Sequence, residues 1–167
     1  SKKFLFLRST PKSDTELLMK LLLAEGESVI SYIEGIFSFV LVSLRDGSLL
    51  ISRDSSGVKP LYIYEKPEVL IISSEIKAIK MITDYSISIS EDDLFEALAL
   101  GFNTEPSTGF KEIKKISMGS WVKFDGFSKI EEAQFCFRNQ ESKTRNLFST
   151  IRNVVQQQTS SDVPVGI

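Results

Sequence analysis

An aspartate near the start of this chain and a charged segment near its middle are the residues whose types and spacing could do chemistry. Asp14 stands in Ser13-Asp14-Thr15-Glu16, a Ser-x-x-Glu pattern that is typical of a helix start. In the structural interpretation, the helix dipole stabilises this first-turn carboxylate by roughly 0.3–1 kcal/mol. In the functional interpretation, the same carboxylate binds a cationic group such as the ammonium of an amino acid.

The charged segment reads Arg53-Asp54-Ser55-Ser56-Gly57-Val58-Lys59-Pro60-Leu61-Tyr62 and surrounds a glycine turn. Neighbouring strand residues point to opposite faces, so we expect Arg53 and Asp54 to have different partners. Two interpretations stay open at this point. The segment is either a solvent-exposed loop at a strand end, or an ion-pair network at a domain junction or substrate channel.

The composition excludes several kinds of active site within the chain. With no histidine, Ser-His-Asp triads, Cys-His pairs and His-ligated zinc are excluded, and one cysteine excludes an intrachain disulfide. We expect that cysteine, Cys136 between two phenylalanines, to be a buried and inert thiol. Lys111, Lys114 and Lys115 form a small basic cluster, which is more typical of a solvated face than of a binding site.

The amino-acid composition is typical of a globular chain and lacks the excess of basic residues that marks a nucleic-acid-binding protein. Its 167 residues include 20 Lys and Arg against 22 Asp and Glu, and 42% are hydrophobic. No apolar run reaches the ~18 to 20 residues of a membrane helix, and no signal peptide is evident, which favours a cytoplasmic location. Because the chain opens without Met and stops in an apolar stretch, we expect it to be a fragment cut at both ends.

Apolar periodicity predicts the elements that position these residues. A helix is expected from near Asp14 to Gly26, and a second short helical piece over 27–32. The stretch 36–44 predicts a strand buried on both faces. Three further strands, over 49–52, 61–64 and 69–72, are expected to continue it as a four-strand antiparallel meander.

The second half of the chain alternates capped helices with loops. Ser90 and Gly101 are expected to bound a helix, and 102–126 to form short strands and loops. The polar stretch 129–143 is the predicted linker. Helical spacing then runs from Leu147 to Gln158, and a strand beginning at Val163 would make this the start of an α/β unit.

Six segments in this order resemble the family of glutamine-hydrolysing asparagine synthetases. They are Ser13-Asp14-Thr15-Glu16-Leu17-Leu18, Glu34-Gly35-Ile36-Phe37-Ser38-Phe39-Val40-Leu41, the charged segment above, Ser74-Glu75-Ile76-Lys77-Ala78, Phe110-Lys111-Glu112-Ile113-Lys114-Lys115 and Ser161-Asp162-Val163-Pro164-Val165-Gly166. The ordered set is far more specific than any single segment.

The resemblance implies an α+β fold and two domains. Residues 1–138 would be the C-terminal part of a class II glutaminase domain, an αββα sandwich of the N-terminal-nucleophile type. Residues 139–167 would be a linker and the first helix and strand of an α/β ATP-pyrophosphatase domain. In the whole enzyme, an N-terminal cysteine releases ammonia from glutamine, and the ammonia converts β-aspartyl-AMP, made from aspartate and MgATP, to asparagine.

The resemblance also implies which residues of this chain take part. Asp14 would bind the α-ammonium of glutamine, whereas Arg53, Asp54, Lys59 and Glu75 would support a domain junction or channel. No catalytic or metal-binding residue is expected here, and neither ATP nor Mg²⁺ would bind to this fragment alone. The fragment itself is therefore expected to be inactive, and marginally stable because apolar faces such as 36–44 stay uncovered.

The implied partners are glutamine, aspartate and ATP, with no nucleic acid and no membrane, and a homodimer is open to the whole enzyme. Two alternatives to this function remain. The chain could come from a related amidotransferase that acts on a sugar, a peptide or a β-lactam precursor. It could also be a degenerate glutaminase-like module that only binds a partner or ligand.

Overall fold

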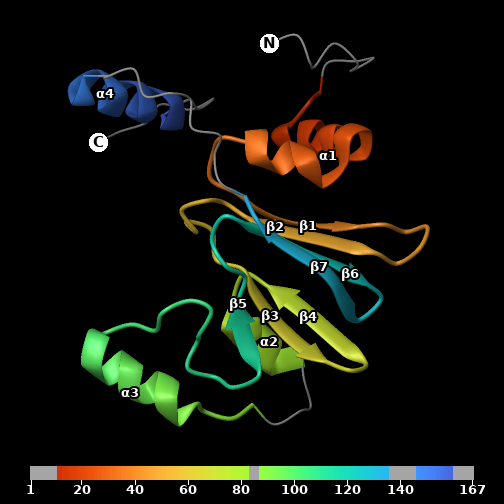
Figure 1. Ribbon diagram of the computed structural model, residues 1–167, viewed down its shortest axis with the longest axis vertical. Coiled ribbons are helices and arrows are strands. Elements are labelled where there is room, and N and C mark those ends of the chain that lie inside the picture. The colour runs from red at the N-terminus through yellow and green to blue at the C-terminus, as the bar shows by residue number, and fades with distance from the viewer. Residues whose placement is uncertain (1–10, 83–86, 136–145, 160–167) are drawn as a thin grey trace. The chain divides into compact units, whose positions relative to one another are not determined.

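The computed structural model describes residues 11–82, 87–135 and 146–159. The chain divides into two units, Ser1–Phe137 and Arg138–Ile167. The first unit holds both sheets and every predicted site residue, and the described part of the second is a single helix (Figure 1). Each unit is considered by itself below.

The first unit begins with helix α1, Asp14–Glu25, followed by a 3₁₀ helix, η1, over Gly26–Tyr32. As the Ser-x-x-Glu pattern predicts, Ser13 caps α1, and its hydroxyl accepts a hydrogen bond from the amide of Glu16 at 3.2 Å. The Glu16 carboxylate accepts from the amide of Lys12 at 2.8 Å, where a full capping box would use the amide of Ser13. Both predicted helical segments are thus confirmed.

Strands in the described part of the chain form two antiparallel sheets. The first has the order β1-β2-β6-β7 and the second the order β4-β3-β5. Their bounds are β1 Ser38–Val42, β2 Leu49–Arg53, β3 Tyr62–Lys66, β4 Val69–Ser73, β5 Ile113–Lys115, β6 Ser120–Asp125 and β7 Ser128–Gln134. The predicted hairpins β1–β2 and β3–β4 are present, but the single meander is wrong. Strand β2 pairs with β6, far along the chain, so β3 starts a separate sheet.

Three apolar clusters define the layers of the first unit. Leu22 and Ile30 of the helical segments pack with Leu50 and Trp121 on one face of the first sheet. The next residue of β2, Ile51, points the other way and packs between the two sheets, because side chains alternate along a strand. Beyond the second sheet, residues of helix α2, Ile76–Ile82, complete a third cluster. The resulting order is helix, sheet, sheet, helix, a mixed α and β fold with antiparallel sheets.

Strand β1 is an edge strand, which corrects the prediction that 36–44 is buried on both faces. Phe39 and Leu41 pack toward α1, but Val40 and Val42 are 39% and 50% exposed. Leu44, beyond the strand end, is 97% exposed. Among the described residues β1 pairs with β2 alone, and the second sheet has only three strands to cover the face that carries Val40. The apolar composition of 36–44 does not reveal that one face of the strand lacks a packing partner among the described residues.

The predicted linker over 129–143 is also wrong in its first part, because residues 129–134 belong to β7. This strand is polar because it lies at the other edge of the first sheet, where nearly all its residues are exposed. The remainder of that linker is Phe135, which follows β7, and residues 136–143, which lie outside the described residues. The predicted strand from Val163 lies outside them as well.

Two more predicted helices are present. Helix α3, Glu91–Leu100, is capped by the Ser90 hydroxyl and ends at Gly101 in the left-handed conformation. In the second unit, helix α4, Leu147–Gln158, begins after Asn146, whose side chain accepts from the amide of Phe148. Within the described residues, no helix has the length and apolarity needed to cross a bilayer.

Candidate functional site

The guanidinium of Arg53 is the centre of a buried polar cluster at the end of β2. Its side chain is only 6% exposed. Nε donates to the carbonyl of Lys59 at 2.8 Å, Nη2 to that of Gly57 at 2.5 Å and Nη1 to that of Ile116 at 2.8 Å. Nη1 also forms an ion pair with Glu105 at 2.6 Å. Four acceptors therefore satisfy a charge that would be costly to bury alone.

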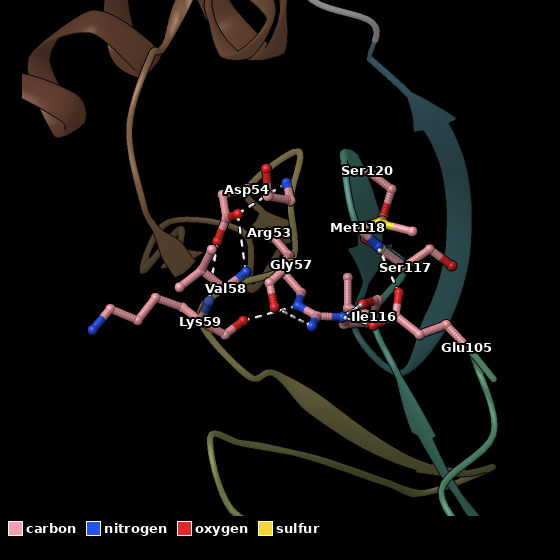
Figure 2. Close-up of polar contacts among 11 residues, drawn as sticks. Arg53, Asp54, Gly57, Val58, Lys59, Glu105, Ile116, Ser117, Met118 and Ser120 are labelled. Atoms are coloured by element: carbon pink, nitrogen blue, oxygen red, sulfur yellow. Dashed lines mark hydrogen bonds and ion pairs between the residues drawn. The ribbon is translucent and has the colours of Figure 1, made fainter. Parts of the chain in front are cut away.

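Glu105 extends this cluster to a third segment of the chain. Its other carboxylate oxygen accepts from the amide of Met118 at 3.1 Å. In Figure 2 the carboxylate of Glu105 reaches toward the guanidinium of Arg53 and the backbone of Met118. The ion pair spans 52 residues of sequence, so no local pattern could have linked these two side chains before the structure. Sequence reasoning therefore missed Glu105.

The carboxylate of Asp54 organises the loop that follows β2. Oδ1 accepts from the amides of Ser56 and Val58 at 3.0 and 3.1 Å, and Oδ2 from that of Lys59 at 3.1 Å. Asp54 is 1% exposed. Burial raises the pKa of its carboxyl, but the amides of Lys59, Val58 and Ser56 more than offset this and hold the pKa below its usual value. The group is therefore charged at neutral pH.

The backbone of Asp54 connects the loop to neighbouring segments. Its amide donates to the carbonyl of Phe37 at 2.9 Å, just before β1. Its carbonyl accepts from the amides of Gly57 and Gly119 at 3.0 and 2.9 Å. Gly57 has a φ of +61°, and a Cβ there would lie 2.7 Å from Nη2 of Arg53. Two features therefore require glycine at this position: the positive φ of the turn and the lack of space for a Cβ beside the guanidinium.

We call these residues, Arg53, Asp54, Gly57 and Glu105 with the backbone of Lys59, the Arg53–Asp54 cluster. As alternation along the strand predicts, Arg53 binds carbonyls and a carboxylate while Asp54 binds amides. Lys59 contributes only its amide and carbonyl to these contacts, and Figure 2 shows its side chain pointing away from the guanidinium.

Glu75 lies outside the cluster. Its carboxylate pairs with Nζ of Lys77 at 2.6 Å, between side chains that are 55% and 79% exposed. An exposed pair of this kind contributes little to stability, because water screens both charges. Of the four residues expected to support a junction or channel, the structure brings together Arg53, Asp54 and, through its backbone, Lys59. Their role at a junction or channel stays a prediction.

Asp14, the expected glutamine ligand, is the first residue of α1 and is exposed. The capping hydrogen bond comes from Ser13, so Asp14 is not needed to cap the helix. Glu16, on the same turn, is instead occupied by Lys20 at 2.7 Å. Within the described residues, no hydrogen bond or ion pair engages the Asp14 carboxylate. It is therefore accessible to a cationic ligand, and its binding role stays a prediction.

The described residues offer no obvious metal centre. Across 11–82, 87–135 and 146–159, no three Cys, Asp or Glu side chains gather closely enough to hold a metal ion. Cys136, expected to be an inert thiol, lies outside the described residues.

Comparison with known proteins gives a consistent result. Residues 6–136 match the family described as glutamine amidotransferase domain. The chain is 31% identical over 163 residues to asparagine synthetase (glutamine-hydrolyzing) 3 of Bacillus subtilis, a match that covers 92% of the chain and 26% of that protein. It is also 31% identical to asparagine synthetase (glutamine-hydrolyzing) 1 of the same organism, over 92% of the chain and 25% of that protein.

A third relative provides a similar match. The probable asparagine synthetase (glutamine-hydrolyzing) of Dictyostelium discoideum is 27% identical over 93% of the chain and 25% of its own length. The chain thus spans about a quarter of the length of the curated relatives it matches.

Proposed function

The chain belongs to the glutamine amidotransferase domain family, and on that premise we propose that it is part of a glutamine-dependent asparagine synthetase. In this proposal, the domain supplies ammonia from glutamine, and aspartate is the acceptor. The observation that carries it is the similarity to glutamine-hydrolysing asparagine synthetases along 92% of the chain. The two facing sheets between helical layers support an N-terminal-nucleophile fold for the first unit.

Asp14 is the proposed ligand of the α-ammonium of glutamine. Its carboxylate is exposed, stands at the start of α1 and is left unengaged by the described residues. A charge-assisted hydrogen bond from an ammonium group to such a carboxylate contributes about 1.5–3 kcal/mol. Asp14 would therefore act in glutamine binding and leave the use of free ammonia untouched.

The Arg53–Asp54 cluster is proposed to hold the loop after β2 and the segment after β5 in fixed positions. It joins the end of β2 in the first sheet to Ile116, which follows β5 of the second sheet. Within the described residues, the hydrogen bonds of Arg53 and Asp54 all go to other groups of the chain, so the proposed role of the cluster is positioning. A domain junction or ammonia channel is the place where such a rigid connection would matter.

ATP and Mg²⁺ are proposed as cofactors of the whole protein. The described residues contain no glycine-rich phosphate loop and no cluster of metal-binding side chains. We therefore assign no residue of this chain to the nucleotide. The start of an ATP-pyrophosphatase domain after residue 138 and a homodimer likewise remain proposals that rest on the family resemblance. A cytoplasmic location remains a proposal that rests on the sequence pattern.

The substitution Asp14→Ala in the complete protein tests the proposal. We expect the KM for glutamine to rise about 10- to 150-fold, the equivalent of 1.5–3 kcal/mol, while asparagine formation from free ammonia is retained. Glu91→Ala is the matched control, because Glu91 is likewise the first helical residue after a capping serine. Unchanged glutamine kinetics would return Asp14 to a purely helical role. Absence of asparagine among the products would favour a different acceptor.

A further inference from the structure

Helix α3 of the first unit has its polar and apolar sides reversed. A surface helix of a globular protein normally packs its apolar side on the core and exposes its polar side. In α3 the apolar residue Leu94 is exposed, and Phe95 and Leu98 are 68% and 75% exposed. Among the described residues, none of the three apolar clusters includes a residue of α3. The apolar side of this helix therefore lies outside the core of the first unit.

Polar groups of α3 contact the loop that leads from this helix to β5. The carboxylate of Asp93 accepts from the amide of Gly109 at 3.0 Å, and the Asp93 carbonyl accepts from the side-chain amide of Asn103 at 2.5 Å. The carboxylate of Glu96 accepts from the amide of Thr104 at 3.0 Å and from its hydroxyl at 2.5 Å. The polar side of the helix thus faces the chain itself.

Spacing along the helix keeps the two sides apart. At 3.6 residues per turn, Leu94, Phe95 and Leu98 share one side, because they stand at positions i, i+1 and i+4. Asp93 and Glu96, at i and i+3, share another side. Apolar residues at such spacing are the anchors by which a helix lies in an apolar groove of a partner. We call Leu94, Phe95 and Leu98 the α3 stripe.

The charge of α3 disfavours a second α3 helix and a membrane as cover for the stripe. Its first turn is acidic and its last turn has no basic residue. Two parallel α3 helices would bring their acidic turns together, and two antiparallel ones would set each acidic turn against the negative end of the other helix dipole. A membrane surface favours apolar stripes flanked by Lys and Arg.

A protein surface with a lysine or arginine beside its groove suits α3 better. Asp92 is exposed, follows the cap of the helix and precedes the stripe, and no ion pair among the described residues involves it. The cation would pair with this carboxylate while the groove covers the apolar side chains. Complementary charge of this kind fixes the orientation in which two surfaces meet.

Chain length favours the rest of the same polypeptide as the source of that surface. The chain spans about a quarter of the length of its curated relatives, and the proposed function makes it part of such a longer protein. A surface tethered to α3 meets it at a high effective concentration. We infer that an apolar groove bordered by lysine or arginine, on the part of the protein outside this chain, covers the α3 stripe. The inference rests on the proposed function in this one respect.

Hydroxyl-radical footprinting of the complete protein, read by mass spectrometry, tests this inference. It measures how fast the Phe95 ring is modified, and a synthetic peptide of residues 91–102 provides the rate for full exposure. With α3 uncovered, a ring that is 68% exposed should react at about two thirds of the peptide rate. We expect less than a tenth of that rate, at every protein concentration, because the contact is within one polypeptide.

Two variants of the complete protein show whether the stripe makes the contact. Leu98→Asp should raise the modification rate of Phe95 at least fivefold. Leu100→Asp is the matched control, since it makes the same change about 200° around the same helix, and it should alter the rate less than twofold. Equal effects of the two variants would count against the inference, because both would then act by unfolding α3.

Two other results would overturn the inference. One is a Phe95 rate near two thirds of the peptide rate in the complete protein. The other is protection that disappears on dilution, which would assign the cover to a second copy. An assay for asparagine on the same preparation keeps the proposed function separate. If Phe95 were protected and no asparagine were formed, the proposed acceptor would be wrong and this inference would stand.

Discussion

Removal of the Asp54 carboxylate should open the loop after β2 locally. This carboxylate accepts hydrogen bonds from the amides of Ser56, Val58 and Lys59. A hydrogen bond to a charged group contributes about 1.5–3 kcal/mol. We take the lower end because Val58 is 54% exposed and water can replace the lost acceptor. Each ~1.36 kcal/mol changes the equilibrium constant for local opening tenfold. Asp54→Ala should therefore speed amide exchange at these three positions about tenfold.

The isosteric variant Asp54→Asn gives a sharper expectation. Its side-chain oxygen can still accept from Ser56 and Val58, whereas its NH₂ group would face the amide of Lys59, donor against donor. Exchange should therefore accelerate mainly at Lys59. Hydrogen exchange read by NMR or by mass spectrometry of short peptides measures this. Asp46→Asn is the control, because Asp46 accepts from the amide of Ser48 in the exposed β1–β2 turn.

The charge of Asp54 predicts the pH dependence of the same loop. Its pKa is lowered in the folded chain, so its contribution to stability is complete above the ordinary carboxyl pKa of about 4. That contribution is lost as pH falls through the lowered pKa. The exchange difference between the native chain and Asp54→Asn should therefore shrink below about pH 4. Equal exchange rates in the native chain and Asp54→Ala at pH 7 would refute the reasoning.

Three further predictions concern the cluster and the sheet edge. Glu105→Gln should lower the thermal midpoint more than Glu75→Gln does, by the equivalent of about 1–2 kcal/mol, because only Glu105 pairs with a buried guanidinium. Gly57→Ala should destabilise more than Gly47→Ala in the same thermal measurement, since both have positive φ but only the former meets Arg53. The isolated chain should unfold over a broad range and bind an apolar dye, because one face of β1 is uncovered; a sharp transition with no dye binding would contradict this.

The helices that begin at a capping residue could be predicted from the sequence because their signals are local, whereas α2 was missed. Ser13 and Ser90 each precede a helix whose cap they provide, and Gly101 ends the second in the left-handed conformation that glycine favours. Strands β1 to β4 and their two hairpins could also be predicted, but β7 and the division into two sheets could not. Whether β2 continues to β3 or pairs with β6 depends on contacts between distant residues, about which the alternation of apolar side chains says nothing.

The candidate site shows the same division. The sequence singled out Arg53 and Asp54 and predicted that they have separate partners, because adjacent strand residues face opposite ways. It could not identify Glu105, which comes from a segment 52 residues away. Glu75, carried over from the family resemblance, lies in an exposed pair with Lys77 instead. A sequence motif thus indicates which residues cooperate only when those residues are close together in the sequence.

The contacts of the charged segment explain its residue types without a substrate. Arginine suits the first position because its planar donors reach several carbonyls at once, and aspartate suits the second because it accepts from the amides of the same loop. This has a consequence for any activity measurement. A change at Arg53 or Asp54 that lowers activity should also accelerate exchange in the loop, whereas a change at Asp14 should lower glutamine use alone. The two readouts together therefore separate positioning from substrate binding.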